Sequence, residues 1–408
     1  MRFNVLISCL FYLITTAKLY AGIADTTQIP IFAWGGVPPE ETSAARYEEM
    51  KNAGITISLT RSTTIDSMAM MLDMAEQAGV QLIVRCPELQ TNPESTVRRF
   101  MNHPATGGYY LTDEPSALAF EALGLWANRI RAIDSQHFCY LNLLPNYAVP
   151  AQLGTASYQQ HVRAFMNSVP VPFLSFDHYP VIENKGGRSL RKEWFENLEI
   201  IAGESKKENK PFWAFALSVA HGLYPVPTLA EIRLQVFANL AYGAQGIQYF
   251  TYWTPKNKSQ YAYHNGPIGD NKKRTGVYEM IRTVNREIQN LSGILLSSKV
   301  ISVEHTGKEI PDGTQRLAKL PEGVKKISIK GEGAIVSVLE KEGVRYMVIV
   351  NRDFVNPMKL TIKSRSTLEK VSKNGTMLNT RKHSSSVAIG PGDIAVYRLN
   401  NINGISFK

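Results

Sequence analysis

The sequence predicts an α/β protein in which a (β/α)8 TIM barrel is followed by a small C-terminal antiparallel β-sandwich domain. From residue 29 to about residue 291, eight short apolar runs alternate with amphipathic stretches. Strands that are apolar along their whole length are typical of a parallel sheet covered on both faces. After residue 296 the runs alternate polar and apolar residues, which is typical of antiparallel sheets.

The expected barrel strands are the apolar runs at 29–36, 55–62, 80–88, 108–114, 138–146, 172–180, 211–218 and 246–253. The expected helices lie near 40–53, 64–78, 93–103, 116–133, 155–168, 189–208, 228–243 and 275–291. Eight such units over this length match a (β/α)8 barrel. A doubly wound sheet also alternates strands and helices, but the GGVPP segment after Trp34 lacks the spacing of a phosphate-binding glycine loop.

The expected organisation has three parts: a signal peptide at 1–24, a catalytic-like barrel at 25–296 and the sandwich at 297–408. Residues 340–343, Glu-Lys-Glu-Gly, lie between two alternating runs and predict a hairpin turn. Related barrels often assemble through appended domains, so the sequence leaves an oligomer open.

The first 24 residues have the pattern of a secretory signal. Arg2 precedes an apolar run over 5–16, and Gly-Ile-Ala at 22–24 offers a small-residue cleavage site. We therefore expect a secreted or periplasmic protein. Lipid anchoring is not expected because Cys9 comes too early in the apolar run. That run is also too short to span a membrane comfortably, and no later segment has a transmembrane pattern.

The net charge of +10 is concentrated at the C-terminal end of the chain. Residues 297–408 hold 19 Lys and Arg against 10 Asp and Glu, whereas 25–296 is close to neutral. A basic surface suits acidic polysaccharide or membrane, but a solvated lysine-rich sheet is the simpler interpretation. The region lacks the aromatic residues that nucleic-acid binders interleave with basic ones, so no nucleic-acid partner is expected. Cys86 and Cys139 lie in apolar runs and are expected to be buried free thiols.

Polar and aromatic residues gather where the expected strands end, which is where barrels of this kind carry their chemistry. Carboxylates and amides bind sugar hydroxyls and aromatic rings stack on pyranose faces, so this set predicts a sugar site. No His or Cys spacing suits a metal, no G-x-S-x-G is present, and no cofactor is expected. The candidates are Trp34, Arg61, Glu88, Asp113, Glu114, Asn142, Asp177, His178, Tyr179, His221 and Trp253.

Three segments resemble the large clan of (β/α)8 glycoside hydrolases, and most closely its family 42 β-galactosidase-like branch. Thr-Asp-Glu-Pro at 112–115 is similar to the motif that places the clan's acid/base Glu at the end of strand four. Phe-Asp-His-Tyr-Pro at 176–180 resembles the strand-six segment with a site tyrosine, and 232–253 resembles the last helix–strand unit. The resemblance implies that Glu114 is the general acid, Tyr179 a site residue and Trp253 the floor of the sugar site.

The seventh expected strand departs from this family pattern. The clan's nucleophile is a Glu at the end of strand seven, but residues 210–218 contain no carboxylate. Three accounts fit the missing nucleophile. The first is an inverting pair of Glu114 and Asp177, for which separations of roughly 6.5–9.5 Å are needed. In the second, Glu88 or Asp113 is the second carboxylate, and in the third the barrel binds glycans without cleaving them. Adjacent strand residues point apart, so Asp113 is expected to support or orient rather than to serve as the second carboxylate.

The sequence thus predicts a secreted glycoside hydrolase that degrades a glycan, with Glu114 as general acid and Asp177 as the favoured second carboxylate. The alternative is a catalytically impaired glycan-binding barrel. For Asp177, a purely structural role and a catalytic role are given equal weight. His178 and His221 are expected to bind hydroxyls or to be structural, Glu88 to be structural or to bind substrate, and the face shared by Trp213 and Phe215 to be core.

Overall fold

The structure is a computed structural model that describes residues 27–256, 261–365, 367–379 and 383–399. The expected signal peptide at 1–24 lies outside these residues. Within them no helix is long and apolar enough to cross a membrane.

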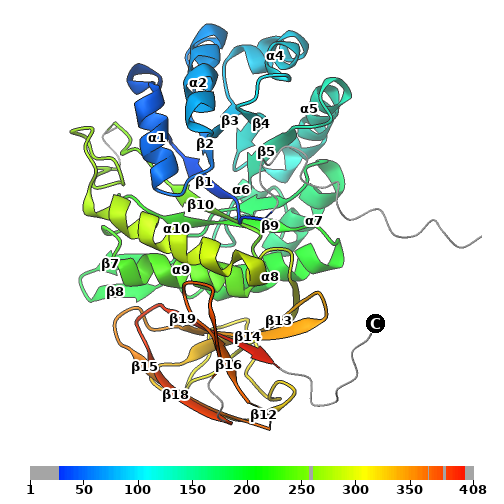
Figure 1. The fold of residues 1–408 in the computed structure, drawn as a ribbon. Coiled ribbons are helices and arrows are strands. Elements are labelled where there is room, and N and C mark those ends of the chain that lie inside the picture. The colour runs from blue at the N-terminus through cyan, green and yellow to red at the C-terminus, as the bar shows by residue number, and fades with distance from the viewer. Residues whose placement is uncertain (1–26, 257–260, 366, 380–382, 400–408) are drawn as a thin grey trace, which may run out of the picture.

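Eight parallel strands form the barrel, and their order in the sheet is β5-β4-β3-β2-β1-β10-β9-β6. The two end strands close the barrel because Leu143, just after β5, donates its N–H to Ser175 O in β6 at 2.8 Å. The predicted fold class is thereby confirmed (Figure 1). The strands are β1 (Ile31–Trp34), β2 (Ile57–Leu59), β3 (Gln81–Val84), β4 (Thr106–Asp113), β5 (Phe138–Asn142), β6 (Leu174–Phe176), β9 (Phe212–Leu217) and β10 (Gly246–Phe250).

Helices follow the strands and cover the outside of the barrel. Several begin at the hydroxyl side chains expected at N-caps; Thr228, for example, accepts from the backbone N–H of Glu231, which caps it in return. The helices are α1 (Ala44–Asn52), α2 (Ile65–Ala78), α3 (Glu88–Thr91), α4 (Pro93–Phe100), α5 (Phe120–Ile133), α6 (Pro150–Leu153), α7 (Tyr158–Ser168), α8 (Trp194–Lys207), α9 (Leu229–Ala241) and α10 (Gly276–Leu295), with 3-10 turns at Pro39–Glu41 and Ala117–Ala119.

One insertion interrupts the repeat after β6. Residues expected to begin a helix near 189 instead pair as a hairpin of β7 (Val181–Asn184) and β8 (Gly187–Leu190). The turn between them contains Gly186, and Gly187, the first residue of β8, has a φ of 99°, a conformation that glycine adopts without a Cβ clash. Helix α8 therefore begins only at Trp194.

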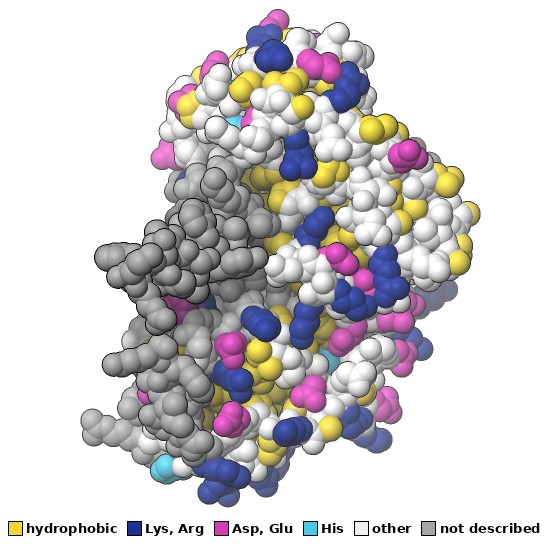
Figure 2. All heavy atoms as spheres, turned by 90° about the vertical axis from the view of Figure 1, so that its right-hand side faces the viewer, with side chains coloured by type: hydrophobic (Ala, Val, Ile, Leu, Met, Phe, Trp, Pro, Cys, Tyr) yellow, Lys and Arg dark blue, Asp and Glu magenta, His cyan; other side chains and the backbone are white. Residues whose placement is uncertain are grey.

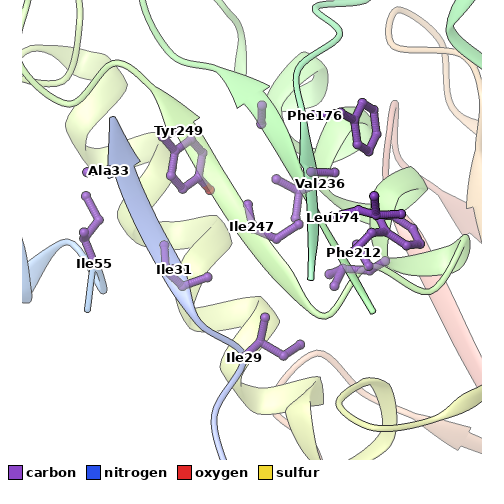
Figure 3. Close-up of a cluster of buried hydrophobic side chains, with 14 of the residues drawn as sticks. Ile29, Ile31, Ala33, Ile55, Leu174, Phe176, Phe212, Val236, Ile247 and Tyr249 are labelled. Atoms are coloured by element: carbon purple, nitrogen blue, oxygen red, sulfur yellow. The ribbon is translucent and has the colours of Figure 1, made fainter. Parts of the chain in front are cut away.

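The barrel strands bury both faces, so alternate residues enter two different cores. In β9, Trp213, Phe215 and Leu217 fill the interior of the barrel, which confirms that Trp213 and Phe215 share a core face. The residues between them pack outward against the helices. Figure 3 shows this outer layer, in which side chains of β1, β6 and β10 surround Val236 of α9. Interior packing by large aromatic rings leaves only the two ends of the barrel for chemistry.

The C-terminal region is a sandwich of two antiparallel sheets, a six-stranded sheet β11-β13-β14-β19-β16-β17 and a three-stranded sheet β12-β15-β18. Glu342 and Gly343 both have positive φ, 51° and 76°, as a two-residue hairpin turn requires, so the predicted hairpin is confirmed. The strands are β11 (Lys299–His305), β12 (Val324–Lys330), β13 (Ala334–Lys341), β14 (Val344–Asn351), β15 (Met358–Ser364), β16 (Glu369–Val371), β17 (Met377–Asn379), β18 (Ser384–Ile389) and β19 (Ile394–Leu399).

The six-stranded sheet joins the two parts of the molecule. One face, which includes Val336 and Ile349, packs on the three-stranded sheet. The opposite face, which includes Ile335 and Val348, belongs to the same core as the barrel helices, and α9 contacts β13 and β14. The sandwich thus lies against α8 and α9 on the side of the barrel (Figure 1).

The surface of the sandwich is mixed in charge. On the face shown in Figure 2, Lys and Arg side chains lie beside Asp and Glu rather than in one basic patch. Cys86 and Cys139 are buried free thiols, as predicted.

Candidate active site

The candidate site lies at the carboxyl end of the barrel strands, here called the barrel mouth, and is built around the end of β4. Glu114 has a φ of 46°, a left-handed conformation that is uncommon for residues other than glycine and that is often found at functional sites. Its N–H donates to Asn142 O at 2.8 Å, and the β4–β5 register shifts between Tyr110 and Thr112. The expectation that Asp113 and Glu114 point apart depends on regular strand alternation, which this backbone breaks at Glu114. The charge of Asp177 acts on both carboxyl groups.

Three carboxyl groups therefore meet at the mouth. The side chains of Glu114 and Asp177 are hydrogen-bonded to each other. Burial, and then the neighbouring charge of Asp177, raises the pKa of Asp113 to about 7. Burial is also the first cause that raises the pKa of Glu114 and of Asp177 above their ordinary values. The burial of Asp113 and Glu114 is incomplete: neighbouring atoms crowd both carboxyl groups, yet both residues keep surface that is exposed to water, so a substrate can reach them.

The expected inverting pair of Glu114 and Asp177 stays a prediction, and the separation of the two carboxyl groups bears on it. An inverting pair is separated by roughly 6.5–9.5 Å and a retaining pair by roughly 5–5.5 Å. A hydrogen bond between two carboxyl groups requires oxygen atoms within about 3 Å. The interaction between Glu114 and Asp177 therefore brings the two carboxyl groups close together in this structure, and a like charge nearby makes each of them harder to ionise.

A buried polar network below these acids fixes their position. Asn142 donates from Nδ2 to Asp177 Oδ1 at 2.8 Å and also bonds to Asp113. Its Oδ1 accepts from Ser175 Oγ at 2.9 Å, and Gln248 Nε2 donates to the same Ser175 oxygen at 2.9 Å. Tyr140 donates to Gln248 Oε1 at 2.6 Å. Satisfied buried networks of this kind hold side chains in one arrangement.

One side of the mouth combines aromatic rings with an arginine. Trp34 packs edge-on to Tyr110 with ring centroids 6.0 Å apart. The guanidinium of Arg85 lies 4.2 Å from the centre of the Tyr110 ring and 5.9 Å from that of Trp34, within cation–π range. Arg85 also counteracts the rise in the pKa of Asp113.

The opposite side is an aromatic cluster around Tyr179, which lies close enough to Asp177 to counteract the rise in the pKa of that carboxyl group. The ring of Tyr179 lies 5.7 Å from that of Tyr224 and 5.5 Å from that of Phe250. His221 is buried and stacks on Tyr263 at 4.9 Å, and burial lowers its pKa. His178 is buried behind Tyr147.

The end of β9 carries no carboxylate. Leu217 and Val219 enter the barrel interior, and Ser218 donates to Thr251 O at 2.8 Å. Glu204 is far back on α8 and is paired with Arg163 and Lys207. The structure thus retains the departure seen in the sequence.

Three predicted site residues are not brought into this cluster. Trp253 packs with the outer core, where Arg46 of α1 lies 5.2 Å from its ring centre. Glu88 begins α3, and its side chain is hydrogen-bonded to Cys86. Arg61 is exposed after β2 and makes no hydrogen bond or ion pair with the part of the chain that the structure describes. Phe250, not Trp253, is the aromatic residue that lies beside Tyr179.

Sequence reasoning missed Arg85, Ser175, Gln248 and Arg191. Arg85 directly follows β3 and could have been found as the charged residue in an apolar run. Gln248 is a fully buried amide inside β10, and a polar residue at an inward position is a signal of the same kind. Within the described residues, no group of three or more His, Cys, Asp or Glu side chains could hold a metal ion.

The comparisons with known proteins agree with this geometry. The sequence model of glycoside hydrolase family 42, described as β-galactosidase, matches residues 129–291. A search of curated proteins found no match. One solved structure, the β-galactosidase of the psychrophilic Marinomonas ef1, is 12% identical with a TM-score of 0.47; the alignment covers 65% of this chain and 60% of that chain.

Three other solved structures align with more than nine-tenths of the chain. A catalytic mutant of a GH42 β-galactosidase from G. stearothermophilus has a TM-score of 0.61 at 8% identity, with 91% of this chain and 98% of that chain covered. The β-galactosidase of Bacillus circulans sp. alkalophilus has a TM-score of 0.58 at 8% identity, with 91% and 99% covered. The polyextremophilic β-galactosidase of the Antarctic haloarchaeon Halorubrum lacusprofundi has a TM-score of 0.52 at 10% identity, with 91% and 99% covered.

The fold is thus a (β/α)8 barrel like that of the GH42 β-galactosidases, with acids at the end of its fourth strand. The chain is similar to family 42, and the predicted resemblance is confirmed.

Proposed function

We propose that the protein is a glycoside hydrolase in which Glu114 is the general acid and Asp177 the second carboxylate. The observation that carries the proposal is the hydrogen-bonded pair of Glu114 and Asp177 at a water-accessible end of the barrel. A general acid must hold its proton near neutral pH, and the raised pKa of Glu114 meets this requirement. The family match supports a glycan as the substrate.

In the proposed reaction Glu114 gives its proton to the glycosidic oxygen as the bond to the anomeric carbon breaks. The ionised carboxylate of Asp177 stabilises the positive charge that develops on the sugar. Water then completes hydrolysis and returns a proton to Glu114. Because the two carboxyl groups are in contact, a bound sugar must enter between them and separate them. The anomeric form of the first product, followed by NMR, reports whether that separation is of the inverting or the retaining kind.

The direct test is Glu114→Gln, assayed first on aryl β-galactosides because the matching family is described as β-galactosidase. We expect kcat to fall by about 10²–10⁴-fold, the usual contribution of a general acid. Glu121→Gln makes the same chemical change at an exposed position on α5 and should leave kcat unchanged. Full activity of Glu114→Gln would remove Glu114 from the mechanism.

A glycan-binding barrel without hydrolytic activity is the second candidate. It is favoured by the bare end of β9, where the clan places its nucleophile. Isothermal titration that finds sugar binding, together with no product from a broad glycan panel, would support this candidate over hydrolysis.

Export from the cytoplasm belongs to the same proposal and is supported by the pattern of residues 1–24. N-terminal sequencing of protein expressed with its full chain should find cleavage near residue 24. A mature protein that still begins at residue 1 would contradict export by a cleaved signal.

A further inference from the structure

The β7–β8 hairpin carries an arginine to the barrel mouth. The hairpin is held to α9 because Arg188 Nη1 donates to both carboxylate oxygens of Glu231, at 2.9 and 3.0 Å. Directly after it, the N–H of Arg191 donates to Pro180 O at 2.7 Å. These two attachments fix the chain on both sides of the hairpin, so Arg191 lies beside the segment that follows β6.

The guanidinium of Arg191 is held by two tyrosines and has no charged partner. Its central carbon lies 4.6 Å from the ring centre of Tyr147 and 5.7 Å from that of Tyr224. One terminal nitrogen donates to Tyr224 OH at 3.2 Å, while the buried Nε has no hydrogen-bond partner. No ion pair to Arg191 occurs in the part of the chain that the structure describes. Buried donors without partners are rare in folded proteins and call for an explanation.

His178 is a second buried side chain whose polar atoms have no hydrogen-bond partner, and this observation is independent of Arg191. It is 1% exposed, and neither ring nitrogen has a hydrogen-bond partner. The edge of its ring meets Tyr147, with ring centroids 5.0 Å apart. Burial, together with the charge of Arg191, lowers the pKa of His178 to about 3. The imidazole is therefore neutral at physiological pH and keeps one N–H donor free.

The cluster of Arg191, Tyr147 and His178 lies next to the acidic residues of the candidate site. Tyr224, which accepts the Arg191 hydrogen bond, packs against Tyr179 with ring centroids 5.7 Å apart. Tyr179 in turn lies close enough to Asp177 to counteract the rise in the pKa of that carboxyl group. A sugar whose anomeric carbon is at the Glu114–Asp177 pair therefore has Arg191 as a neighbour one side-chain layer away. Tyr147, which carries the guanidinium of Arg191 on its ring, is 37% exposed.

We propose that Arg191, with His178 and Tyr147, binds the carboxylate of a uronic acid residue, so that the substrate is an acidic glycan. This inference rests on the proposed function and names its substrate class. The planar guanidinium fork matches a carboxylate with two parallel hydrogen bonds, and an ionised partner makes those bonds stronger. A neutral sugar would leave the guanidinium of Arg191 without an ion pair, because none of the acids of the mouth pairs with it.

The test compares the binding of methyl β-D-galactopyranosiduronic acid and methyl β-D-galactopyranoside by isothermal titration at neutral pH. We expect the full-length protein to bind the uronate at least about 10-fold more tightly, which corresponds to about 1.4 kcal/mol. Arg191→Gln should abolish this preference. Arg98→Gln removes the same charge from the exposed surface of α4 and should retain it. Thermal melts confirm that each variant is folded.

Arg191→Lys is the second variant, because it keeps the charge and loses the fork; we expect it to lose most of the preference. Equal affinities for the two sugars, binding of neither sugar, or a preference that survives in folded Arg191→Gln would overturn the proposal. Tighter binding of galactose 6-sulfate than of the uronate would overturn the carboxylate assignment. Since no turnover is needed, a uronate preference without any cleavage would contradict the hydrolase function and leave this site intact.

Discussion

Replacing Asp177 with Asn should lower the pKa of Glu114. The raised pKa of Glu114 comes from burial and from the neighbouring charge of Asp177, and Asn removes the charge while keeping the size. Two unit charges about 4 Å apart repel by about 1 kcal/mol in bulk water and about 4 kcal/mol at an effective dielectric constant of 20. Because water reaches Glu114, the lower part of this range applies, about 1–2 kcal/mol. At 1.36 kcal/mol for each pH unit, the pKa should fall by about one unit.

The assay is an NMR titration of protein labelled with ¹³C at the glutamate side-chain carboxyl carbons. Glu114→Gln identifies the Glu114 signal by its loss. The midpoint for Glu114 should move to lower pH in Asp177→Asn and stay in place in Asp66→Asn, a change on the exposed start of α2. An unchanged or higher midpoint in Asp177→Asn would refute the coupling of the two carboxyl groups.

Three further predictions concern stability. The raised pKa of Asp113 means that the folded protein holds a proton that the unfolded chain releases, so the free energy of unfolding should fall as pH rises from about 4 to about 7. Asp113→Asn should therefore raise Tm at pH 8 and leave it nearly unchanged at pH 4. Equal effects on Tm at both pH values would contradict the repulsion between the carboxyl groups. Arg188→Ala leaves the buried carboxylate of Glu231 with only its cap to Thr228. Urea denaturation should show that the free energy of unfolding falls by about 3 kcal/mol, the lower end for a broken buried ion pair. A change within error of zero would show that this ion pair does not hold the hairpin. Gly392 has a φ of 64°, and an added Cβ would lie 2.1 Å from Ala230 O of α9. Gly392→Ala should therefore lower the free energy of unfolding by more than the roughly 1–2 kcal/mol of the left-handed backbone alone. A variant as stable as the native protein would contradict the docking of the sandwich on α9.

The barrel could be predicted because its strands are buried on both faces. A run such as 211–218 can only be a strand between two apolar layers, and period two then assigns Trp213 and Phe215 to one core. A helix was expected from residue 189, but residues 187–190 pair with 181–184, and this pairing depends on a glycine-containing turn whose partners periodicity does not specify.

The site was only partly predictable because its side chains lie beyond the regular strands. Strand position correctly brought Glu114, Asp177, Asn142 and Tyr179 to one place. Once the backbone of Glu114 takes a positive φ, strand alternation no longer gives side-chain direction, and Asp113 joins the cluster. The same limit misplaced Trp253, which follows β10 by three residues and packs outward instead. Arg191 depends on the hairpin and could not be placed without it.

The central claim, that Glu114 donates the proton to the leaving oxygen, is tested most directly by the dependence of Glu114→Gln on the leaving group. A dinitrophenyl glycoside departs without protonation, whereas a methyl glycoside needs the acid. The account predicts that Glu114→Gln retains most of the native rate on the dinitrophenyl substrate and loses about 10²–10⁴-fold on the methyl substrate. An equal loss on both substrates would contradict the assignment of Glu114 as the general acid.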